Sequence, residues 1–170
     1  MSVLIYRIIV STYGLLIQLA AFFNKKAALW VEGRRNWKES LQKQEINLNR
    51  NNKTFWVHCA SVGEFEQARP LIEGLKLENP GSNIVLTFFS PSGYELRKNY
   101  NGADIITYLP LDSSSNAKFW LDTIKPHAVF FIKYEFWFYY LNETAIRKIP
   151  LYSVSAIFRK NQSFVRSWGN

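Results

Sequence analysis

The feature that most limits the fold is a regular alternation, from Thr54 onward, of short apolar runs with helical patterns. Short apolar runs rich in residues that favour β structure are typical of strands. We expect strands at residues 54–60, 83–90, 104–108, 128–133 and 150–155. Strands that alternate with helices predict βαβ units, and therefore an α/β fold with a Rossmann-like parallel sheet.

The segments between these runs carry apolar residues at helical spacing. The first helix would bury one face and the second would begin at a hydroxyl cap, and residues 136–149 would form a third crossover helix. Pro70 limits how early the first helix can begin without a kink. The residues concerned are Phe65, Ala68, Leu71, Ile72 and Leu75 in the first helix, and Ser113–Ser115, Phe119, Leu121 and Ile124 in the second.

Residues 3–23 (VLIYRIIVSTYGLLIQLAAFF) are almost entirely apolar, and about 20 such residues can cross a bilayer as a helix. The few polar residues within the run, Arg7 among them, also allow a helix that lies in the membrane interface. We predict a membrane-anchor helix over residues 1–24, spanning or interfacial, in preference to a buried helix of a soluble core. Because positive charge follows the run at Lys25 and Lys26, the rest of the chain is expected on the cytoplasmic side.

Positive charge is concentrated in residues 25–53, which hold eight basic and three acidic residues in a chain of net charge +8. A basic segment beside an apolar one is a common device for binding anionic lipid headgroups. Nucleic acid is the other polyanion to weigh, but no recognisable nucleic-acid reader accompanies the charge. We therefore predict a basic juxtamembrane segment over residues 25–53, a Rossmann-like domain over residues 54–170, membrane lipids as partners and no nucleic acid.

Open parallel sheets bind ligands at the carboxyl ends of their strands, where the next helix presents its amino terminus. The first such end reads Ser61-Val62-Gly63-Glu64, which combines a small hydroxyl, a glycine that permits close approach and a carboxylate. In one interpretation the carboxylate is a first-turn or capping residue of the helix. In the other it is a general base that accepts a proton from a hydroxyl group attacking an electrophilic carbon.

The second strand end reads Ser90-Pro91-Ser92-Gly93. It has the form of a helix start whose hydroxyls and backbone N–H groups can hold an anion such as a phosphate. Neither the GxGxxG spacing of dinucleotide-binding folds nor the GxxxxGK[ST] of the P-loop is present, so hydride transfer and ATP hydrolysis are not supported. After the third strand, Asp112 is interpreted as a helix N-cap or turn residue.

After the fourth strand, Glu135 lies among aromatic residues. It is either an incidental charge on a packed aromatic helix or a site residue, because a charge in such surroundings is costly unless it is paired. His58, inside a strand, and His127, beside a proline, are expected to be structural. No set of His, Asp and Glu has metal-ligand spacing and no D-x-D motif is present, so neither a metal nor another cofactor is predicted.

Taken in order, the apolar amino terminus and five later segments are similar to the amino-terminal domain of 3-deoxy-D-manno-octulosonic acid (Kdo) transferases. The Ala60–Glu64 element (ASVGE) is the most specific part, and the resemblance runs along nearly the whole chain. The segments are Leu29–Arg34, Val57–Glu64, Ser90–Gly93, Tyr108–Asp112 and Glu135–Trp137.

This resemblance implies the acceptor-binding half of a GT-B glycosyltransferase, in which two Rossmann-like domains face a cleft. The carboxyl-terminal domain would bind CMP-Kdo and the amino-terminal domain the lipid A precursor, at the cytoplasmic face of the bacterial inner membrane. Transfer would be inverting and metal-independent, and Glu64 would deprotonate the acceptor hydroxyl. Substrate contacts are expected from Ser61, Gly63, Ser90, Ser92, Gly93, Glu135 and Arg159.

The chain also departs from the family pattern. Lys133 and Phe138 replace the first glutamate and the proline of the family's E-x-E-x-W-P element, and Arg159 stands near the place of a displaced arginine. Because no donor-binding domain follows, we expect a fragment of a longer protein that is inactive by itself. The alternatives are a catalytically inactive, membrane-tethered binding module and a GT-B transferase that acts on another lipid-linked sugar.

Overall fold

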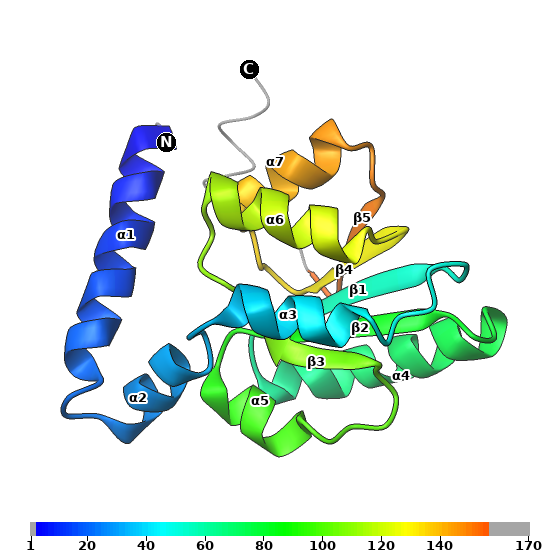
Figure 1. Cartoon of the computed structure of the whole chain (residues 1–170), viewed down its shortest axis with the longest axis horizontal. Helices are drawn as coiled ribbons and strands as arrows, with labels where there is room; N and C mark the ends of the chain where they lie inside the picture. Colours follow the sequence, from blue (N-terminus) through cyan, green and yellow to red (C-terminus); the bar gives the residue numbers. More distant parts are fainter. Residues whose placement is uncertain (1–2, 157–170) are drawn as a thin grey trace.

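A computed structural model describes residues 3–156, in which five parallel strands form one sheet covered by helices (Figure 1). This arrangement confirms the predicted α/β, Rossmann-like fold. In chain order the elements are α1 (Val3–Ala20), α2 (Lys25–Glu32), α3 (Trp37–Glu45), β1 (Thr54–Cys59), α4 (Val62–Glu78), β2 (Asn83–Phe88), α5 (Pro91–Arg97), β3 (Ile105–Tyr108), α6 (Ser114–Ile124), β4 (Ala128–Ile132), α7 (Phe138–Ile146) and β5 (Leu151–Val154).

The strand order in the sheet is β3-β2-β1-β4-β5. Strand β1 is central, and its Phe55 pairs with Ile84 of β2 on one side and with Ala128 of β4 on the other. The chain lays down β2 and β3 on one side of β1 and then crosses over to lay down β4 and β5 on the other. The carboxyl ends of β1 and β4 therefore flank the switch point, the place where doubly wound sheets bind their ligands.

Side chains of β1 alternate between two hydrophobic cores, one on each face of the sheet. Trp56 packs into the first core with Trp120 of α6 and Tyr140 of α7, whereas Cys59 packs into the second with Phe65 of α4. Because both faces are covered, all residues of β1 are buried. This explains why the strand reads as a nearly continuous apolar run.

The predicted strands are confirmed, with ends one or two residues shorter than expected. Helix α4 begins before Pro70, at Val62, and continues through this residue. Proline removes one helical N–H donor, and Pro70 lies on the exposed side of the helix. On the opposite side Ala68 and Ile72 are fully buried, and this burial stabilises the helix despite the lost bond.

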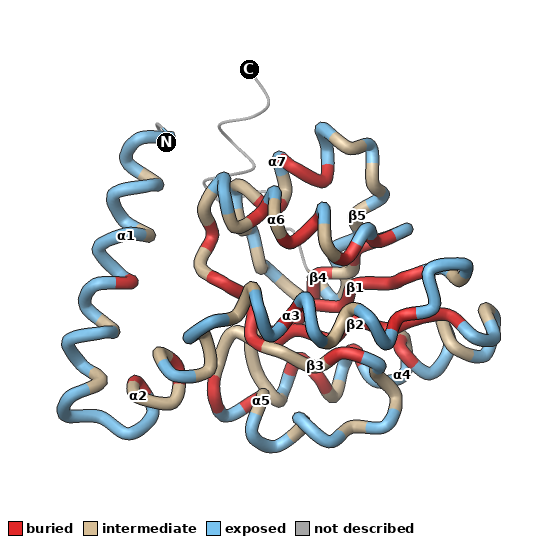
Figure 2. Tube along the Cα trace, in the orientation of Figure 1, coloured by how far each residue is buried: buried red, intermediate tan, exposed pale blue. Residues whose placement is uncertain are grey.

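Helix α1 stands beside the layered domain (Figures 1 and 2). Its inner face carries Tyr6, Val10, Gly14 and Ile17, of which Gly14 is buried and the others are partly buried, while the remaining side is exposed. A Cβ atom on Gly14 would lie 2.7 Å from Leu111 Cδ1, so the glycine permits the helix to approach the domain closely. With 18 residues and a mean hydropathy of 1.7, α1 is long and apolar enough to cross a membrane.

Candidate functional site

Glu64 lies in the first turn of α4, directly after the carboxyl end of β1. Ser61 is the N-cap residue of α4, but its side chain makes no capping hydrogen bond. Instead, Ala60 N donates to Glu64 Oε2 over 2.5 Å, so the carboxylate folds back over the end of the strand. Only 9% of Glu64 is exposed. The predicted first-turn role is therefore correct, and the same contact holds the carboxylate at the switch point.

The surroundings of Glu64 make it a stronger base than a free carboxylate. Burial raises the pKa of the Glu64 carboxyl above its usual range, and the negative charge of Glu135 raises it further. The Ala60 N–H and the charges of His58 and Lys133 act in the opposite direction and lower this pKa without reversing the shift. A carboxylate whose pKa is raised towards the working pH is suited to accept a proton in general-base catalysis.

Glu135 enters the site from the loop that follows β4. Trp137 Nε1 donates to Glu135 Oε2 over 2.8 Å, and the same oxygen lies 3.4 Å from His58 Nε2. The side chain of Glu135 is only 17% exposed. The Glu135 carboxylate therefore has an indole donor and a histidine as neighbours, and its role as a site residue stays a prediction.

His58 was expected to be structural, and the structure places it in the interior of β1, beside the candidate site. The imidazole is fully buried in β1, and its Nδ1 lies 2.9 Å from Thr87 Oγ1 on β2. Thr87 Oγ1 also accepts a hydrogen bond of 2.8 Å from Trp56 Nε1. Which of Thr87 Oγ1 and His58 Nδ1 donates depends on the histidine tautomer, and Thr87 Oγ1 also donates to Val57 O over 3.4 Å. The chain of contacts that starts at Trp56 thus ends at His58, whose Nε2 lies 3.4 Å from Glu135 Oε2 without forming a hydrogen bond.

The two glycines of the predicted substrate-binding set have different surroundings. A Cβ atom on Gly63 would have Ser61 Oγ, 4.0 Å away, as its nearest neighbour, so packing does not require glycine there. A Cβ atom on Gly93 would lie 2.6 Å from Phe88 Cδ1, so packing does require glycine at that position. Of these two glycines, only Gly63 has no packing reason to be a glycine. A bound molecule that approaches the backbone there would be such a reason.

The serines that follow β2 are engaged at the start of α5. Ser90 is the N-cap residue, and its Oγ accepts a hydrogen bond from Gly93 N over 3.3 Å. Ser90 Oγ also lies 3.1 Å from Ser92 Oγ. Capping accounts for this sequence pattern, and substrate binding by these residues stays a prediction. Arg159 lies outside the described residues.

Asp112 lies in the loop before α6, but its carboxylate caps a different helix, α7. Ser113 caps the following helix α6, whereas the Asp112 carboxylate accepts hydrogen bonds from Tyr139 N (2.9 Å) and Tyr140 N (3.1 Å) in the first turn of α7. Tyr6 of α1 also donates its hydroxyl to Asp112. Asp112 therefore joins α1 to the helix that follows Glu135.

Arg34, which contributes to the basic segment in the sequence, is used to hold the fold together. Its Nε donates to Leu109 O over 2.9 Å, its Nη2 donates to Phe89 O over 2.8 Å, and its guanidinium lies 3.8 Å from the ring centre of Trp30. Burial lowers the pKa of Arg34 to about 9. This side chain ties the loops after β2 and β3 to the end of α2.

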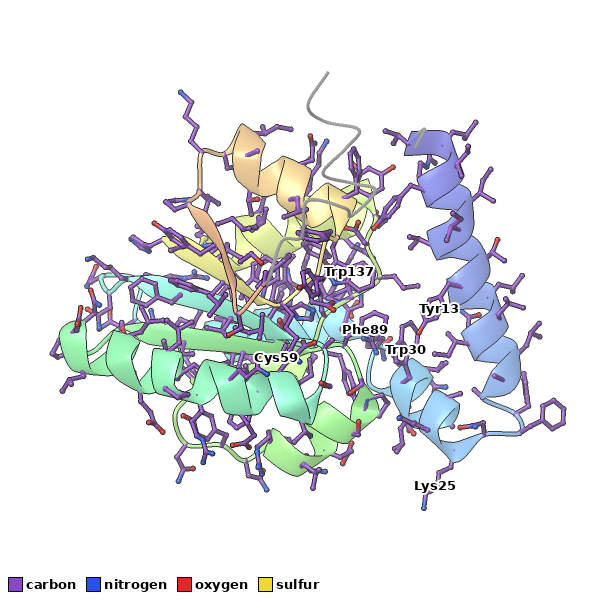
Figure 3. The ribbon with its side chains drawn as sticks, turned by 180° about the vertical axis from the view of Figure 1, so that it is seen from behind. Tyr13, Lys25, Trp30, Cys59, Phe89 and Trp137 are labelled. Atoms are coloured by element: carbon purple, nitrogen blue, oxygen red, sulfur yellow. The ribbon has the colours of Figure 1, made fainter. Side chains whose placement is uncertain are left out.

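Four rings connect α1 to the site, and we call them the aromatic bridge: Tyr13, Trp30, Phe89 and Trp137 (Figure 3). Tyr13 lies 5.9 Å from Trp30 and 6.1 Å from Phe89 between ring centres. Phe89 lies 4.9 Å from Trp137, whose indole N–H is the donor to Glu135. Such ring pairs contribute about 0.5–1.5 kcal/mol each beyond the area they bury.

Within residues 3–156, no group of three or more His, Cys, Asp and Glu side chains is placed to hold a metal ion. The candidate site in this part of the chain contains the buried carboxylate of Glu64, with a second carboxylate and a histidine near it. Metal independence of the reaction stays a prediction.

The sheet order and the position of Glu64 together define a Rossmann-like domain whose candidate ligand site lies at the switch point between β1 and β4. The sequence model of one family, described as 3-deoxy-D-manno-octulosonic-acid transferase (kdotransferase), matches residues 35–168, which is most of the chain. The chain belongs to the amino-terminal domain of this family.

Individual relatives agree with this family assignment. The 3-deoxy-D-manno-octulosonic acid transferase of Aquifex aeolicus (strain VF5) is 39% identical over 83 residues, which are 48% of this chain and 23% of the relative. The Haemophilus influenzae protein of the same name is 30% identical over 102 residues, which are 59% of this chain and 24% of the relative. A bifunctional glycosyltransferase/methyltransferase of Fusobacterium nucleatum is 26% identical over 103 residues, 59% of this chain and 16% of that protein. The match thus spans about a quarter or less of the length of each relative.

Proposed function

We propose that this chain is the acceptor-binding part of an inverting GT-B glycosyltransferase that moves Kdo from CMP-Kdo to a lipid A precursor in lipopolysaccharide biosynthesis. Membership of the family supports this proposal, as does the position of Glu64 at the switch point of the sheet. The donor would be held by a second Rossmann-like domain in the longer protein. The cleft between the two domains would face the carboxyl ends of β1 and β4.

The reaction that the site supports is a direct displacement. The oxygen of an acceptor sugar hydroxyl attacks the anomeric carbon of Kdo, a new carbon–oxygen bond forms, and the bond between that carbon and the phosphate oxygen of CMP breaks. CMP leaves with the bonding electron pair, and the hydroxyl proton passes to the Glu64 carboxylate. Glu135 would orient the acceptor or Glu64, and His58 would hold Glu135 in place.

One observation carries the proposal: Glu64 is a buried carboxylate with a raised pKa, held by the Ala60 N–H at the switch point. A surface carboxylate in the first turn of a helix would show neither burial nor a raised pKa. The departures at Lys133 and Phe138 leave this arrangement intact, and in this chain a cation replaces one acidic neighbour of the base.

We place the protein at the cytoplasmic face of the bacterial inner membrane, held there by α1. The exposed apolar side of α1 supports membrane association. Tyr6, near the start of α1, and Gly14, in its second half, both contact the domain. A helix in contact with the domain along its length fits a position within the membrane interface better than one across the bilayer.

The test is Glu64→Gln in the full-length protein, assayed with CMP-Kdo and lipid A precursor. Glutamine keeps an oxygen that accepts the Ala60 N–H but cannot accept the proton, so kcat should fall by about 10²–10⁴-fold while acceptor binding is retained. The matched control is Glu66→Gln, two residues further along the same helix, where the carboxylate is partly exposed and pairs with Arg97 over 2.7 Å. Wild-type turnover in Glu64→Gln would remove this residue from the mechanism.

The same experiment separates the alternatives. A membrane-tethered binding module would bind the acceptor but transfer no Kdo in the wild-type protein, so Glu64→Gln would change nothing measurable. A transferase for another lipid-linked sugar would show turnover only with a different acceptor or donor, and that turnover would still depend on Glu64. Loss of activity on chelation of divalent metals would contradict the metal-independent mechanism.

A further inference from the structure

A pocket of about 420 Å³ lies between α1 and the edge of the sheet that carries the candidate site. Helix α1 supplies one wall through Tyr6, Ile9, Val10 and Tyr13. The loop after β2 supplies Phe89, and the loop after β4 supplies a short aromatic run that contains Glu135. The pocket is therefore a space that exists only because α1 stands beside the domain.

The walls of this α1 pocket are held in place from both ends. Tyr6 donates to Asp112 over 2.5 Å and accepts a hydrogen bond from Phe138 N over 3.3 Å, which joins the start of α1 to α7. At the other end, Tyr13 belongs to the aromatic bridge and contacts Trp30 and Phe89. These contacts make α1 a fixed wall of the pocket and not only a tether.

The lining is apolar and aromatic apart from one charge. Among the described residues that line the pocket, Glu135 alone is ionisable as an acid or base at neutral pH, and the same carboxylate faces His58 in the candidate site. A phosphate in the pocket would be repelled by Glu135, whereas hydroxyl groups of a sugar can donate hydrogen bonds to it. The lining thus suits a molecule with an apolar tail and a sugar head.

The position of the pocket favours a tail that comes from a membrane. The other face of α1 exposes Ile5, Ile8, Leu15, Leu16 and Leu19, each by half or more. An apolar surface of this extent on one helix is suited to contact with lipid. A chain leaving the bilayer beside α1 would reach Glu135 along the pocket without crossing a polar surface.

We propose that the α1 pocket binds one acyl chain of the lipid acceptor and thereby presents the acceptor sugar to Glu135 and Glu64. This inference rests on the proposed function and adds to it a subsite to which α1 contributes directly. The acyl chain would lie against Ile9 and Val10, and the sugar would lie at the polar end beside Glu135. The apolar helix then has two roles, membrane attachment on its outer face and substrate binding on its inner face.

The first experiment uses photolabelling and does not depend on turnover. A lipid A precursor with a diazirine at the end of one acyl chain is bound to the full-length protein and irradiated, and labelled peptides are identified by mass spectrometry. We expect labels at Ile9 and Val10, and we expect excess unlabelled acylated acceptor to suppress them. A phospholipid should not suppress them.

Two outcomes would overturn the proposal. Labels confined to Ile8 and Leu16 would show contact with the outer face of α1 only. Suppression by phospholipid as strong as that by the acceptor would show that the pocket holds membrane lipid. If the inner face is labelled but the protein transfers no Kdo, the result supports acyl-chain binding in the pocket and refutes the proposed reaction. If Kdo is transferred without labelling of the inner face, the result supports the proposed reaction and refutes acyl-chain binding in the pocket.

The second experiment fills the pocket with a larger side chain. Val10→Trp and Ile9→Trp should each raise the KM for the acylated acceptor by about tenfold, the effect expected when about two methylene groups are kept out of an apolar site. The KM for the deacylated disaccharide should not change. The control is Ile8→Trp, because Ile8 has an exposure (57%) close to that of Ile9 (52%) but does not line the pocket. Equal KM values for the acylated acceptor in Val10→Trp, Ile9→Trp and Ile8→Trp would refute the proposal.

Discussion

Replacing Gly63 by alanine tests whether glycine at this position is required for stability or for activity. The new Cβ atom would have no protein atom nearer than Ser61 Oγ at 4.0 Å, and Gly63 is exposed in the first turn of α4. Alanine in a helix is more stable than glycine by about 0.5–1 kcal/mol. We therefore expect Gly63→Ala to leave the free energy of unfolding unchanged or to raise it by up to about 1 kcal/mol.

The effect on activity should have the opposite sign. If the acceptor sugar approaches the backbone at Gly63, the added methyl group collides with it, and a collision of about 1–3 kcal/mol lowers kcat/KM by roughly 5–150-fold. Gly74→Ala is the matched control, because Gly74 lies in the same helix and a Cβ atom there would meet nothing within 4 Å. That variant should be equally stable and fully active.

Two measurements decide the matter: denaturant unfolding of the detergent-solubilised protein, and steady-state kinetics of the full-length enzyme. Wild-type kcat/KM in Gly63→Ala would refute the argument that a ligand requires glycine at this position. A loss of stability of more than about 1 kcal/mol would refute the argument that the space around Gly63 is empty in the folded protein.

Two further predictions concern the neighbours of Glu64. Because the Glu135 carboxylate raises the pKa of Glu64, Glu135→Gln should lower that pKa and move the acid limb of the kcat/KM profile to lower pH; an upward shift would contradict this. Thr87→Val leaves the Trp56 N–H and His58 Nδ1 without their partner, and it should lower the free energy of unfolding by about 2–4 kcal/mol. Thr87→Ser keeps the hydroxyl and should cost only about 1 kcal/mol; equal losses in the two variants would refute a role for the hydrogen bonds.

Much of the fold is local and was predictable. The strands and the buried face of α4 follow from residue periodicity, because a strand or helix buries a face whose spacing is set by its own geometry. The Ser61–Glu64 turn was found for the same reason, since any strand end in a parallel sheet is a candidate for ligand binding. The exposed position of Pro70 within α4 could not be predicted from the sequence, because it depends on how α4 packs.

The candidate site was only partly predictable because its members meet through tertiary contacts. His58 reads as one more residue of a buried strand, and its role emerges only when β4 pairs beside β1 and brings Glu135 to its Nε2 atom. The cap formed by Asp112 and the clamp formed by Arg34 likewise depend on partners far away in the chain. No local pattern could have named those partners.

By itself, the sequence determined the elements of this protein: five apolar strands, the helices between them, an apolar first helix and a carboxylate at a strand-to-helix turn. Only the tertiary structure decided that β1 and β4 are neighbours, and that α1 stands beside them to form a pocket next to Glu135. The physical reason is that periodicity encodes which side of an element is buried. The partner on that side is chosen by packing and hydrogen bonding across the whole domain.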